Sequence, residues 1–390
     1  MIRVGFIISL TNQSWLGGLN YFRNLLSAIH SLPDRKIEPV IFTGCQADLT
    51  LSKGFPPIEI IQTPLLDRKH PQWLLRKSWA KLLSHDLFLE KLFLKQHITL
   101  LSHSISLGKQ AKIPTIGWIP DFQHTYLPEF FSKKEIHSRN RQFRNMLHSC
   151  SYIIVSSKAA KQDLIKFDSS SGFKASVLQF VSDFGTLTNP PNLDYLEKSY
   201  KFQGLYFHLP NQFWAHKNHR VVIEALKILK ARNQKVLVLV TGNTKDYRQL
   251  NYFPSLMKYA EESDVLDCFR VLGIIPYSDL VALMTNSISL INPSLFEGWS
   301  TTVEEAKSLG KQIILSDIAV HREQAPERGE FFDPRNAESL AEIMWKVWSS
   351  WDMDTDRQFM HKARETLLKR KLEFAKNYQD IVMSVISQAN

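Results

Sequence analysis

Two carboxylates, Glu297 and Glu305, are separated by seven residues around a predicted helix start. The apolar run 288–291 predicts a strand, and Gly298 predicts a turn after it. Glu297 is therefore expected in the loop and Glu305 on the first turn of the following helix. The free N–H groups of a helix start attract phosphate, and carboxylates accept hydrogen bonds from sugar hydroxyls. This combination predicts a site for a nucleotide-sugar.

The alternative is that these are ordinary acidic residues of a first helical turn, which the helix dipole favours. We prefer this interpretation for Glu304, because Thr301-x-x-Glu304 fits a capping box. Glu297 precedes the predicted cap and lies in a loop, where the dipole gives it little support. Glu297 and Glu305 therefore remain candidates for ligand binding.

The segment resembles the retaining GT-B glycosyltransferases of the group 1, or family 4, type. Their hallmark is a Glu, seven residues and a second Glu in the donor domain, as at Glu297 and Glu305. Further segments match in order and spacing, namely Asn292-Pro293-Ser294, Gly310-Lys311, Ser316-Asp317, His216-Lys217-Asn218-His219 and Ile119-Pro120-Asp121-Phe122-Gln123-His124. Together these segments cover most of the chain.

The resemblance implies an α/β GT-B fold, in which two Rossmann-like doubly wound domains face each other across a cleft. The acceptor domain would span 1–190 and the nucleotide-sugar donor domain 200–362. Residues 363–390 would form a C-terminal helix that packs back on the first domain, and the apolar spacing in 374–386 suits such a helix.

The resemblance also assigns roles to individual residues. Lys217 would contact the donor diphosphate, Glu305 the ribose hydroxyls and Glu297 the transferred sugar, while His124 would lie near donor sugar and acceptor. We therefore expect His124, Glu297 and Lys217 to be catalytic. For His124 the alternative is a structural histidine, and for Lys217 a surface lysine.

Six further positions complete the expected donor site. Gly17 and Gly18 match a loop over the donor phosphates, for which a simple tight turn is the alternative, and Gly298 would let the backbone approach the sugar. The remaining ones are Thr301, Thr302 and Gln212. The family often has an arginine at the last of these positions, and a neutral amide cannot supply its charge.

Strand-like and helical patterns alternate along the chain. In the first half, strands are predicted at 1–10, 39–42, 115–118 and 152–155, with a helix at 19–29. The alternation of strands and helices starts again after residue 200, with strands predicted at 205–209 and 236–242 and a helix at 220–230. Such alternation is typical of a parallel sheet that is covered on both faces. The polar, Pro-containing residues 182–200 predict an interdomain hinge.

Charge is distributed unevenly over the 390 residues. The net charge is +10, from 48 Lys and Arg against 38 Asp and Glu, and the whole excess lies in the first 190 residues. This asymmetry predicts a face that meets an anionic partner, and a merely solvated surface is the alternative. The 3 widely spaced cysteines indicate a reducing compartment. We expect a cytoplasmic protein that is soluble or peripheral at the membrane.

Two further segments carry weaker patterns. The acidic run 352–356 lacks the glycine and the final glutamate of a calcium loop, so it predicts an acidic helix entrance, and we expect no metal and no cofactor. Residues 73–94 mix aromatic and basic side chains. They fit a membrane-interface helix or a helix that faces the core, and we favour a core helix whose exposed edge contacts a membrane.

The leading hypothesis is a metal-independent retaining hexosyltransferase. It would move a sugar from a nucleotide-diphosphate donor to a cell-surface or lipid-linked glycan, for example in lipopolysaccharide, O-antigen or other polysaccharide biosynthesis. A nucleotide-sugar epimerase of the same fold is an alternative, as is a basic nucleic-acid-binding protein. The sequence contains no recognisable nucleic-acid-binding module, so no nucleic-acid partner is expected.

Overall fold

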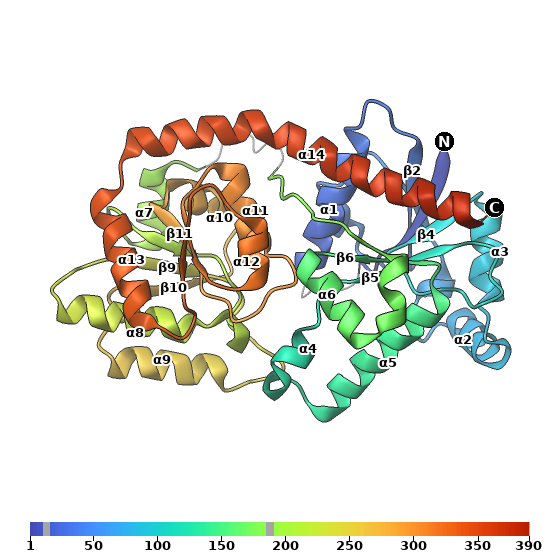
Figure 1. Ribbon diagram of the computed structural model, residues 1–390, viewed down its shortest axis with the longest axis horizontal. Coiled ribbons are helices and arrows are strands. Elements are labelled where there is room, and N and C mark those ends of the chain that lie inside the picture. Colours follow the sequence, from blue (N-terminus) through green and yellow to red (C-terminus); the bar gives the residue numbers. More distant parts are fainter. Residues whose placement is uncertain (11–15, 185–190, 390) are drawn as a thin grey trace. The chain divides into compact units, whose positions relative to one another are not determined.

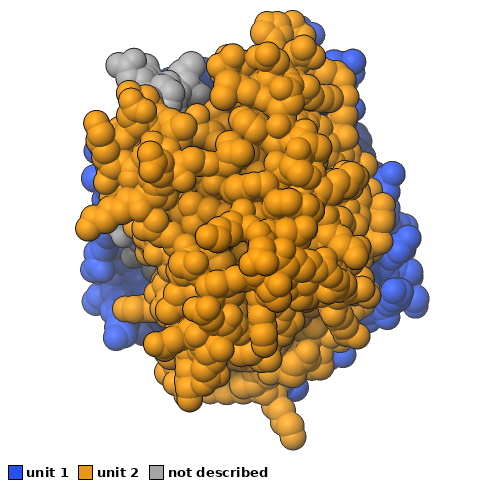
Figure 2. Space-filling model, turned by 90° about the vertical axis from the view of Figure 1, so that its left-hand side faces the viewer, with its two compact units in different colours: residues 1–122, 137–181, 369–390 blue, residues 123–136, 182–368 orange. Residues whose placement is uncertain are grey.

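The structure is a computed structural model that describes residues 1–10, 16–184 and 191–389 (Figure 1). The chain forms two compact units, which Figure 2 shows in different colours. Unit 1 comprises residues 1–122, 137–181 and 369–390, and unit 2 comprises residues 123–136 and 182–368. Each unit therefore gathers segments that are distant in the sequence.

Unit 1 is built on a seven-stranded parallel sheet with the order β3-β2-β1-β4-β5-β6-β7. Its strands are β1 Ile2–Ile7, β2 Ile37–Thr43, β3 Glu59–Gln62, β4 Leu100–Ser102, β5 Thr115–Ile119, β6 Tyr152–Val155 and β7 Ala175–Val177. Its helices include α1 Leu16–His30, α2 Pro71–Leu83, α3 Leu87–Lys95, α5 Lys133–Ser149 and α6 Lys158–Phe167. The first four residues of α5 belong to unit 2.

Unit 2 has a six-stranded parallel sheet with the order β10-β9-β8-β11-β12-β13. The strands are β8 Phe207–Leu209, β9 Val238–Thr241, β10 Phe269–Gly273, β11 Ser289–Asn292, β12 Ile313–Ser316 and β13 Gly329–Phe332. The helices are α4 Gln123–Tyr126, α7 Leu193–Tyr200, α8 His219–Ala231, α9 Tyr252–Glu262, α10 Tyr277–Asn286, α11 Thr301–Leu309, α12 Ala319–Gln324 and α13 Ala337–Ser350. These two parallel sheets confirm the predicted α/β class.

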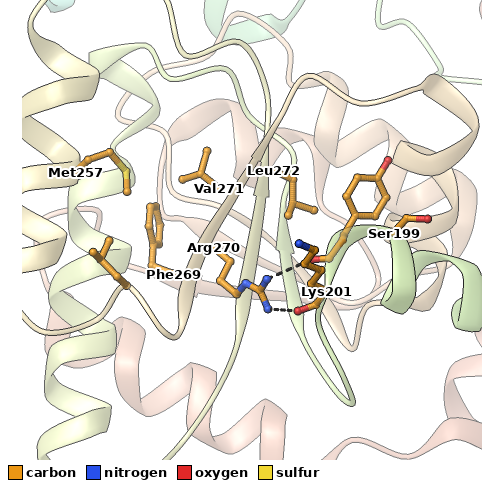
Figure 3. Close-up of a pocket in the computed structure, with 9 residues that line it drawn as sticks. Ser199, Lys201, Met257, Phe269, Arg270, Val271 and Leu272 are labelled. Atoms are coloured by element: carbon orange, nitrogen blue, oxygen red, sulfur yellow. Dashed lines mark hydrogen bonds between the residues drawn. The ribbon is translucent and has the colours of Figure 1, made fainter.

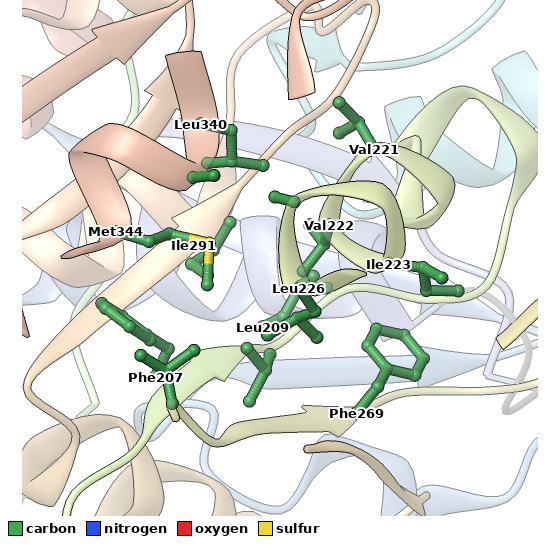
Figure 4. Packing of buried hydrophobic residues seen from close by; sticks show 14 of the residues in the cluster. Phe207, Leu209, Val221, Val222, Ile223, Leu226, Phe269, Ile291, Leu340 and Met344 are labelled. Atoms are coloured by element: carbon green, nitrogen blue, oxygen red, sulfur yellow. The ribbon is translucent and has the colours of Figure 1, made fainter. Parts of the chain in front are cut away.

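Apolar side chains from both layers build the core of unit 2. In Figure 4, Val222 and Leu226 of α8 lie against the sheet residues Leu209 and Ile291, and Met344 of α13 packs beside them. The central strands are buried on both faces, which explains why their sequences are continuous apolar runs rather than alternating ones.

The last helix, α14, spans Met353–Ala389, so it starts well before the helical pattern expected at 374–386. Its first part belongs to unit 2 and residues 369–390 belong to unit 1. There, Gln379 Oε1 accepts a hydrogen bond of 2.7 Å from the backbone N–H of Lys36. Asp352 receives the N–H of Thr355 at 2.8 Å, which makes the acidic run 352–356 the entrance of a helix, as predicted.

Two local predictions were wrong. Helix α1 begins at Leu16, so Gly17 and Gly18 lie in its first turn and not in a loop before it. The interdomain connection predicted at 182–200 starts where unit 2 resumes, at Ser182, and it contains helix α7; residues 185–190 lie outside the described ones. The second wrong prediction concerns residues 73–94. The single helix expected at 73–94 is two helices, α2 and α3, and α2 exposes most of its apolar side chains.

Candidate functional site

The candidate site lies at the carboxyl ends of β8 and β11, two neighbouring strands of unit 2. From β8 the chain builds the sheet outward through β9 and β10, and from β11 it continues on the other side through β12 and β13. The strand order thus reverses between β8 and β11, and doubly wound sheets bind ligands at such a switch point. The loop 210–218 follows β8, and the loop 293–300 follows β11.

Lys217 and Glu297 meet across these two loops. The Lys217 Nζ atom donates to Glu297 Oε1 at 2.6 Å, and the side chains are only 17% and 11% exposed. Lys217 ends a short 3-10 turn, Ala215–Lys217, just before α8. The two side chains are 80 positions apart in the sequence, and the adjacency of β8 and β11 brings them together.

Backbone contacts hold the two loops in register. The N–H of Leu295 donates to the carbonyl oxygen of His216 at 2.8 Å. Asn218 has a φ of 55° and donates from Nδ2 to the carbonyl oxygens of Pro293 and Pro334. The left-handed backbone of Asn218 turns the chain into α8 directly after Lys217. Both members of the ion pair are therefore positioned by a rigid frame.

A buried amide network lies beneath the loop that carries Glu297. Asn292, the last residue of β11, donates from Nδ2 to Ser300 Oγ at 2.7 Å. Its Oδ1 accepts from Ser294 Oγ at 2.8 Å and from Asn211 Nδ2 at 3.2 Å. One buried side chain thus ties both ends of the loop to the strand, and unsatisfied polar groups there would be costly.

Glu297 is ionised in this setting. Burial alone would raise the pKa of the Glu297 carboxyl, but the charge of Lys217, together with its hydrogen bond and contributions from His321 and Ser294, outweighs burial and lowers the pKa below its usual value. A negative charge is therefore present in the loop at neutral pH, balanced by Lys217.

Glu305 has the opposite electrostatics. It is the fifth residue of α11, just past the first turn on which it was expected; it is buried, and burial raises the pKa of its carboxyl to about 8. Within the described residues no ion pair or hydrogen bond of this carboxyl is found. At neutral pH the group is mostly protonated, and a ligand that offers hydroxyl donors would favour its ionised form.

The start of α11 differs from the predicted capping box. Ser300 is the N-cap, and its Oγ accepts the N–H of Val303 at 3.4 Å, so Thr301 is already the first helical residue. Glu304 does not need to act as a cap partner, because the N–H of Ser300 donates to Gln324 Oε1 at 3.1 Å. The Glu304 carboxylate instead contacts Lys307 and Gln324.

The remaining expected donor residues of unit 2 lie around the same loops. Gln212 is half-buried in the loop after β8, and Gly298 is in a bend of the loop after β11. Thr301 and Thr302 form the first turn of α11, whose leading N–H groups have no partner inside the helix. The structure thus gathers these four residues with Lys217 and Glu297 at one edge of the sheet.

A second cation lies next to the loop after β8. The Arg248 guanidinium is 4.9 Å from the centre of the Trp214 ring. It also forms an ion pair of 3.1 Å with Asp246, so its charge is already compensated. Arg248 therefore does not simply replace the arginine that the family often has at the position of Gln212.

Three expected residues lie on other segments. His124 is buried in the short helix α4, which belongs to unit 2, and its ring lies 6.4 Å from that of Phe131. Tyr126 of the same helix has its ring 5.3 Å from the ring of Phe296, the neighbour of Glu297. Gly17 and Gly18 belong to unit 1.

Sequence reasoning missed two residues that affect the Glu297 carboxyl, namely Ser294 and His321 on α12. The His321 Nδ1 atom donates to the carbonyl oxygen of Ser316 at 2.8 Å, while Nε2 accepts from Asn292 at 3.4 Å. Burial lowers the pKa of His321, and the charge of Glu297 acts against this. The polar residues that directly follow β11 and β12 in the sequence could have indicated these two residues.

No metal site emerges from the described part of the chain, because no cluster of three or more His, Cys, Asp or Glu side chains there could hold an ion. Asp356, from the acidic run 352–356, is buried and pairs with Lys311 and Arg328. Its carboxylate is committed to linking α14 to the region around α11.

A cavity of about 470 Å³ lies elsewhere in unit 2, along the outer strand β10 (Figure 3). Arg270 donates there to the carbonyl oxygens of Lys201 and Tyr200. Neither Lys217 nor Glu297 lines this cavity, so it is separate from the site at the switch point.

Comparisons with known proteins concern the fold and the second half of the chain. Residues 205–366 match the family model described as glycosyl transferases group 1. A comparison with curated proteins found no match. The chain is similar in structure to a glycosyltransferase from Rickettsia africae, with 17% identity, a TM-score of 0.67 and coverage of 99% of this chain and 98% of that one.

Two further solved structures are similar over nearly their whole length. HepE from Anabaena, in complex with UDP and glucose, has 14% identity, a TM-score of 0.69 and coverage of 98% of this chain and 100% of that one. The lipopolysaccharide outer core galactosyltransferase WaaB has 16% identity, a TM-score of 0.62 and coverage of 98% and 99%. The fold is GT-B, and residues 205–366 match the family model of the group 1 glycosyl transferases.

Proposed function

We propose that the protein is a retaining glycosyltransferase that moves a hexose-type sugar from a nucleotide-diphosphate donor to a glycan acceptor. The observation that carries this proposal is the Lys217–Glu297 pair at the switch point of unit 2, beside the start of α11. The group 1 family match over residues 205–366 includes all of these elements. The UDP and glucose bound by HepE support a donor of this chemical class.

Each residue of the pair has a distinct role in the proposed reaction. The bond between the anomeric carbon and the donor phosphate breaks, and its electron pair goes to the phosphate oxygen. Lys217 stabilises this leaving diphosphate together with the N–H groups of Thr301 and Thr302. The ionised Glu297 would stabilise the positive charge that develops on the sugar.

The acceptor hydroxyl attacks the anomeric carbon from the face that the leaving group vacates, which retains the configuration. Its proton passes to the departing phosphate oxygen, so no enzyme base is needed in this route. His124 would lie near donor sugar and acceptor, and Gly17 and Gly18 near the donor phosphates. Glu305 would accept hydrogen bonds from the ribose hydroxyls.

We expect no metal and no cofactor, because Lys217 and the start of α11 offer positive charge to the diphosphate. The acceptor would be a cell-surface or lipid-linked glycan, a proposal supported by the likeness to a lipopolysaccharide galactosyltransferase. Such a protein would work in the cytoplasm or at the cytoplasmic face of the membrane. No helix in the described residues is both long and apolar enough to cross a bilayer.

The test is donor binding by the full chain, measured by thermal shift and calorimetry with UDP-glucose, UDP-galactose, UDP-N-acetylglucosamine and GDP-mannose. A donor present at 100 times its Kd adds about 2.7 kcal/mol to the free energy of unfolding. Binding and hydrolysis of the donor should persist in EDTA. Product analysis by NMR then reports the anomeric configuration.

Two results would contradict the proposal. The first is the absence of binding and turnover for every nucleotide-sugar in the panel. The second is a new isomer of the nucleotide-sugar formed without acceptor, which would indicate an epimerase.

A further inference from the structure

Helix α2, Pro71–Leu83, is amphipathic with its apolar face turned outward. The side toward the body of unit 1 carries Arg76, which is buried, and Trp73 and Ala80, which are half-buried. Leu75 and Trp79 lie on the outer side and are 51% and 46% exposed. These residues follow helical spacing, so each set occupies one face of the helix.

The outer face extends over most of the length of the helix. Leu82 is 75% exposed, and Leu74 and Leu83 beside it are 51% and 45% exposed. Ordinary surface helices direct such residues inward. Leu74, Leu75, Trp79, Leu82 and Leu83 together are called the outer apolar face of α2 below.

A buried ion pair fixes this orientation. The Arg76 Nη1 atom donates to the carbonyl oxygen of Leu65 at 2.6 Å, and its Nε atom lies 3.2 Å from Asp86 Oδ2. Asp86 also accepts the N–H of Leu89 at 3.3 Å and so caps α3. Rotating α2 to bury its outer apolar face would break the ion pair and leave two charges buried without partners, which is strongly unfavourable.

Cations surround the outer apolar face, whereas the nearby acids Asp86 and Glu90 have partners within unit 1. The exposed basic residues are Arg68, Lys69, Lys77, Lys81, Lys91 and Lys95. None of them forms an ion pair with any residue that the structure describes. Glu90, by contrast, lies 2.8 Å from His85 Nε2 and accepts the N–H of Lys112 at 2.6 Å.

We propose that α2 lies in the headgroup region of an anionic lipid bilayer, with its outer apolar face toward the acyl chains and the flanking lysines on the lipid phosphates. An exposed apolar face bordered by lysines has the chemistry of an interfacial helix. A second copy of this chain is a worse occupant, because a symmetric dimer through the same face would bring the cations of both copies together. The inference does not depend on the proposed function.

The experiment is flotation of the full chain with vesicles of phosphatidylcholine alone or with about 30 mol% phosphatidylglycerol, whose anionic headgroups attract lysine side chains. We expect binding only to the anionic vesicles, and release in 0.5 M salt, where the Debye length falls to about 4 Å. Leu75→Glu combined with Trp79→Glu should lower the partition coefficient by about tenfold or more.

The matched control is Phe173→Glu, because Phe173 is 84% exposed in the same unit but is not on α2. This variant should bind vesicles as the wild type does. The proposal would be overturned if the wild type bound both kinds of vesicle equally or bound neither. It would also be overturned if the control and the α2 variant lost vesicle binding to the same extent. Light scattering that shows a wild-type dimer which the α2 variant converts to monomer while vesicle binding stays unchanged would overturn it as well.

Discussion

Replacing Glu305 by glutamine should change how the free energy of unfolding depends on pH. The carboxyl has a folded-state pKa of about 8, raised from 4.5 by burial. Between these two values the folded protein binds more protons than the unfolded chain, so its stability falls as the pH rises. Stability is complete below pH 4.5 and is lost progressively up to pH 8.

The size of the effect follows from the two pKa values. From pH 6 to pH 8, proton linkage at this one site removes about 2 kcal/mol from the free energy of unfolding of the wild type. Glu305→Gln has no such titration, so it should gain about 2 kcal/mol relative to the wild type over the same interval. The variant keeps the shape of the side chain and should not disturb the packing of α11.

Urea unfolding at pH 6, 7 and 8 without ligand measures this difference directly. The control is Glu342→Gln, since Glu342 is exposed on α13. Its difference from the wild type should not vary with pH. If the difference between Glu305→Gln and the wild type is also constant from pH 6 to 8, the reasoning about Glu305 is refuted.

Three further predictions concern the pairs around the site. Lys217→Ala should lower kcat/KM for a nucleotide-sugar by about 100-fold or more in steady-state kinetics, because it removes the positive charge that stabilises the leaving diphosphate. It should also lower the melting temperature, since Glu297 is left buried without its cation, whereas Lys217→Met with Glu297→Gln should restore stability but not activity. His124→Ala should reduce turnover more than donor binding, and equal losses in both would indicate a structural histidine. Asp356→Asn should destabilise the fold by about 3 kcal/mol in thermal unfolding, because Lys311 and Arg328 lose their buried partner. An unchanged melting temperature would contradict that assignment.

Much of the fold follows from local sequence. The apolar runs 152–155 and 288–291 became β6 and β11 within one residue, because parallel strands that are buried on both faces are marked by continuous apolar residues. Gly310 ends α11 with a φ of 69°, and a Cβ there would lie 2.3 Å from the carbonyl oxygen of Phe359. Such signals are readable because they act between neighbours in the chain.

The contacts of the site were less predictable. Glu297 lies in a loop as predicted, whereas Glu305, expected on the first helical turn, is the fifth residue of α11. The ion pair with Lys217 was not predicted, because that contact requires β8 and β11 to be adjacent. The cap at Ser300 was missed by one residue, since Asn292 and Gln324, which hold it, approach from other elements. The raised pKa of Glu305 depends on burial, which no local pattern reports.

The most direct test of the central claim is isothermal titration of UDP-sugars and GDP-sugars into the wild type and the Lys217→Met/Glu297→Gln variant. We expect at least one donor to bind the wild type, and its affinity for the equally stable double variant to fall by about tenfold or more. If no nucleotide-sugar binds the wild type, or if both proteins bind the donor with equal affinity, the Lys217–Glu297 site does not hold a nucleotide-sugar.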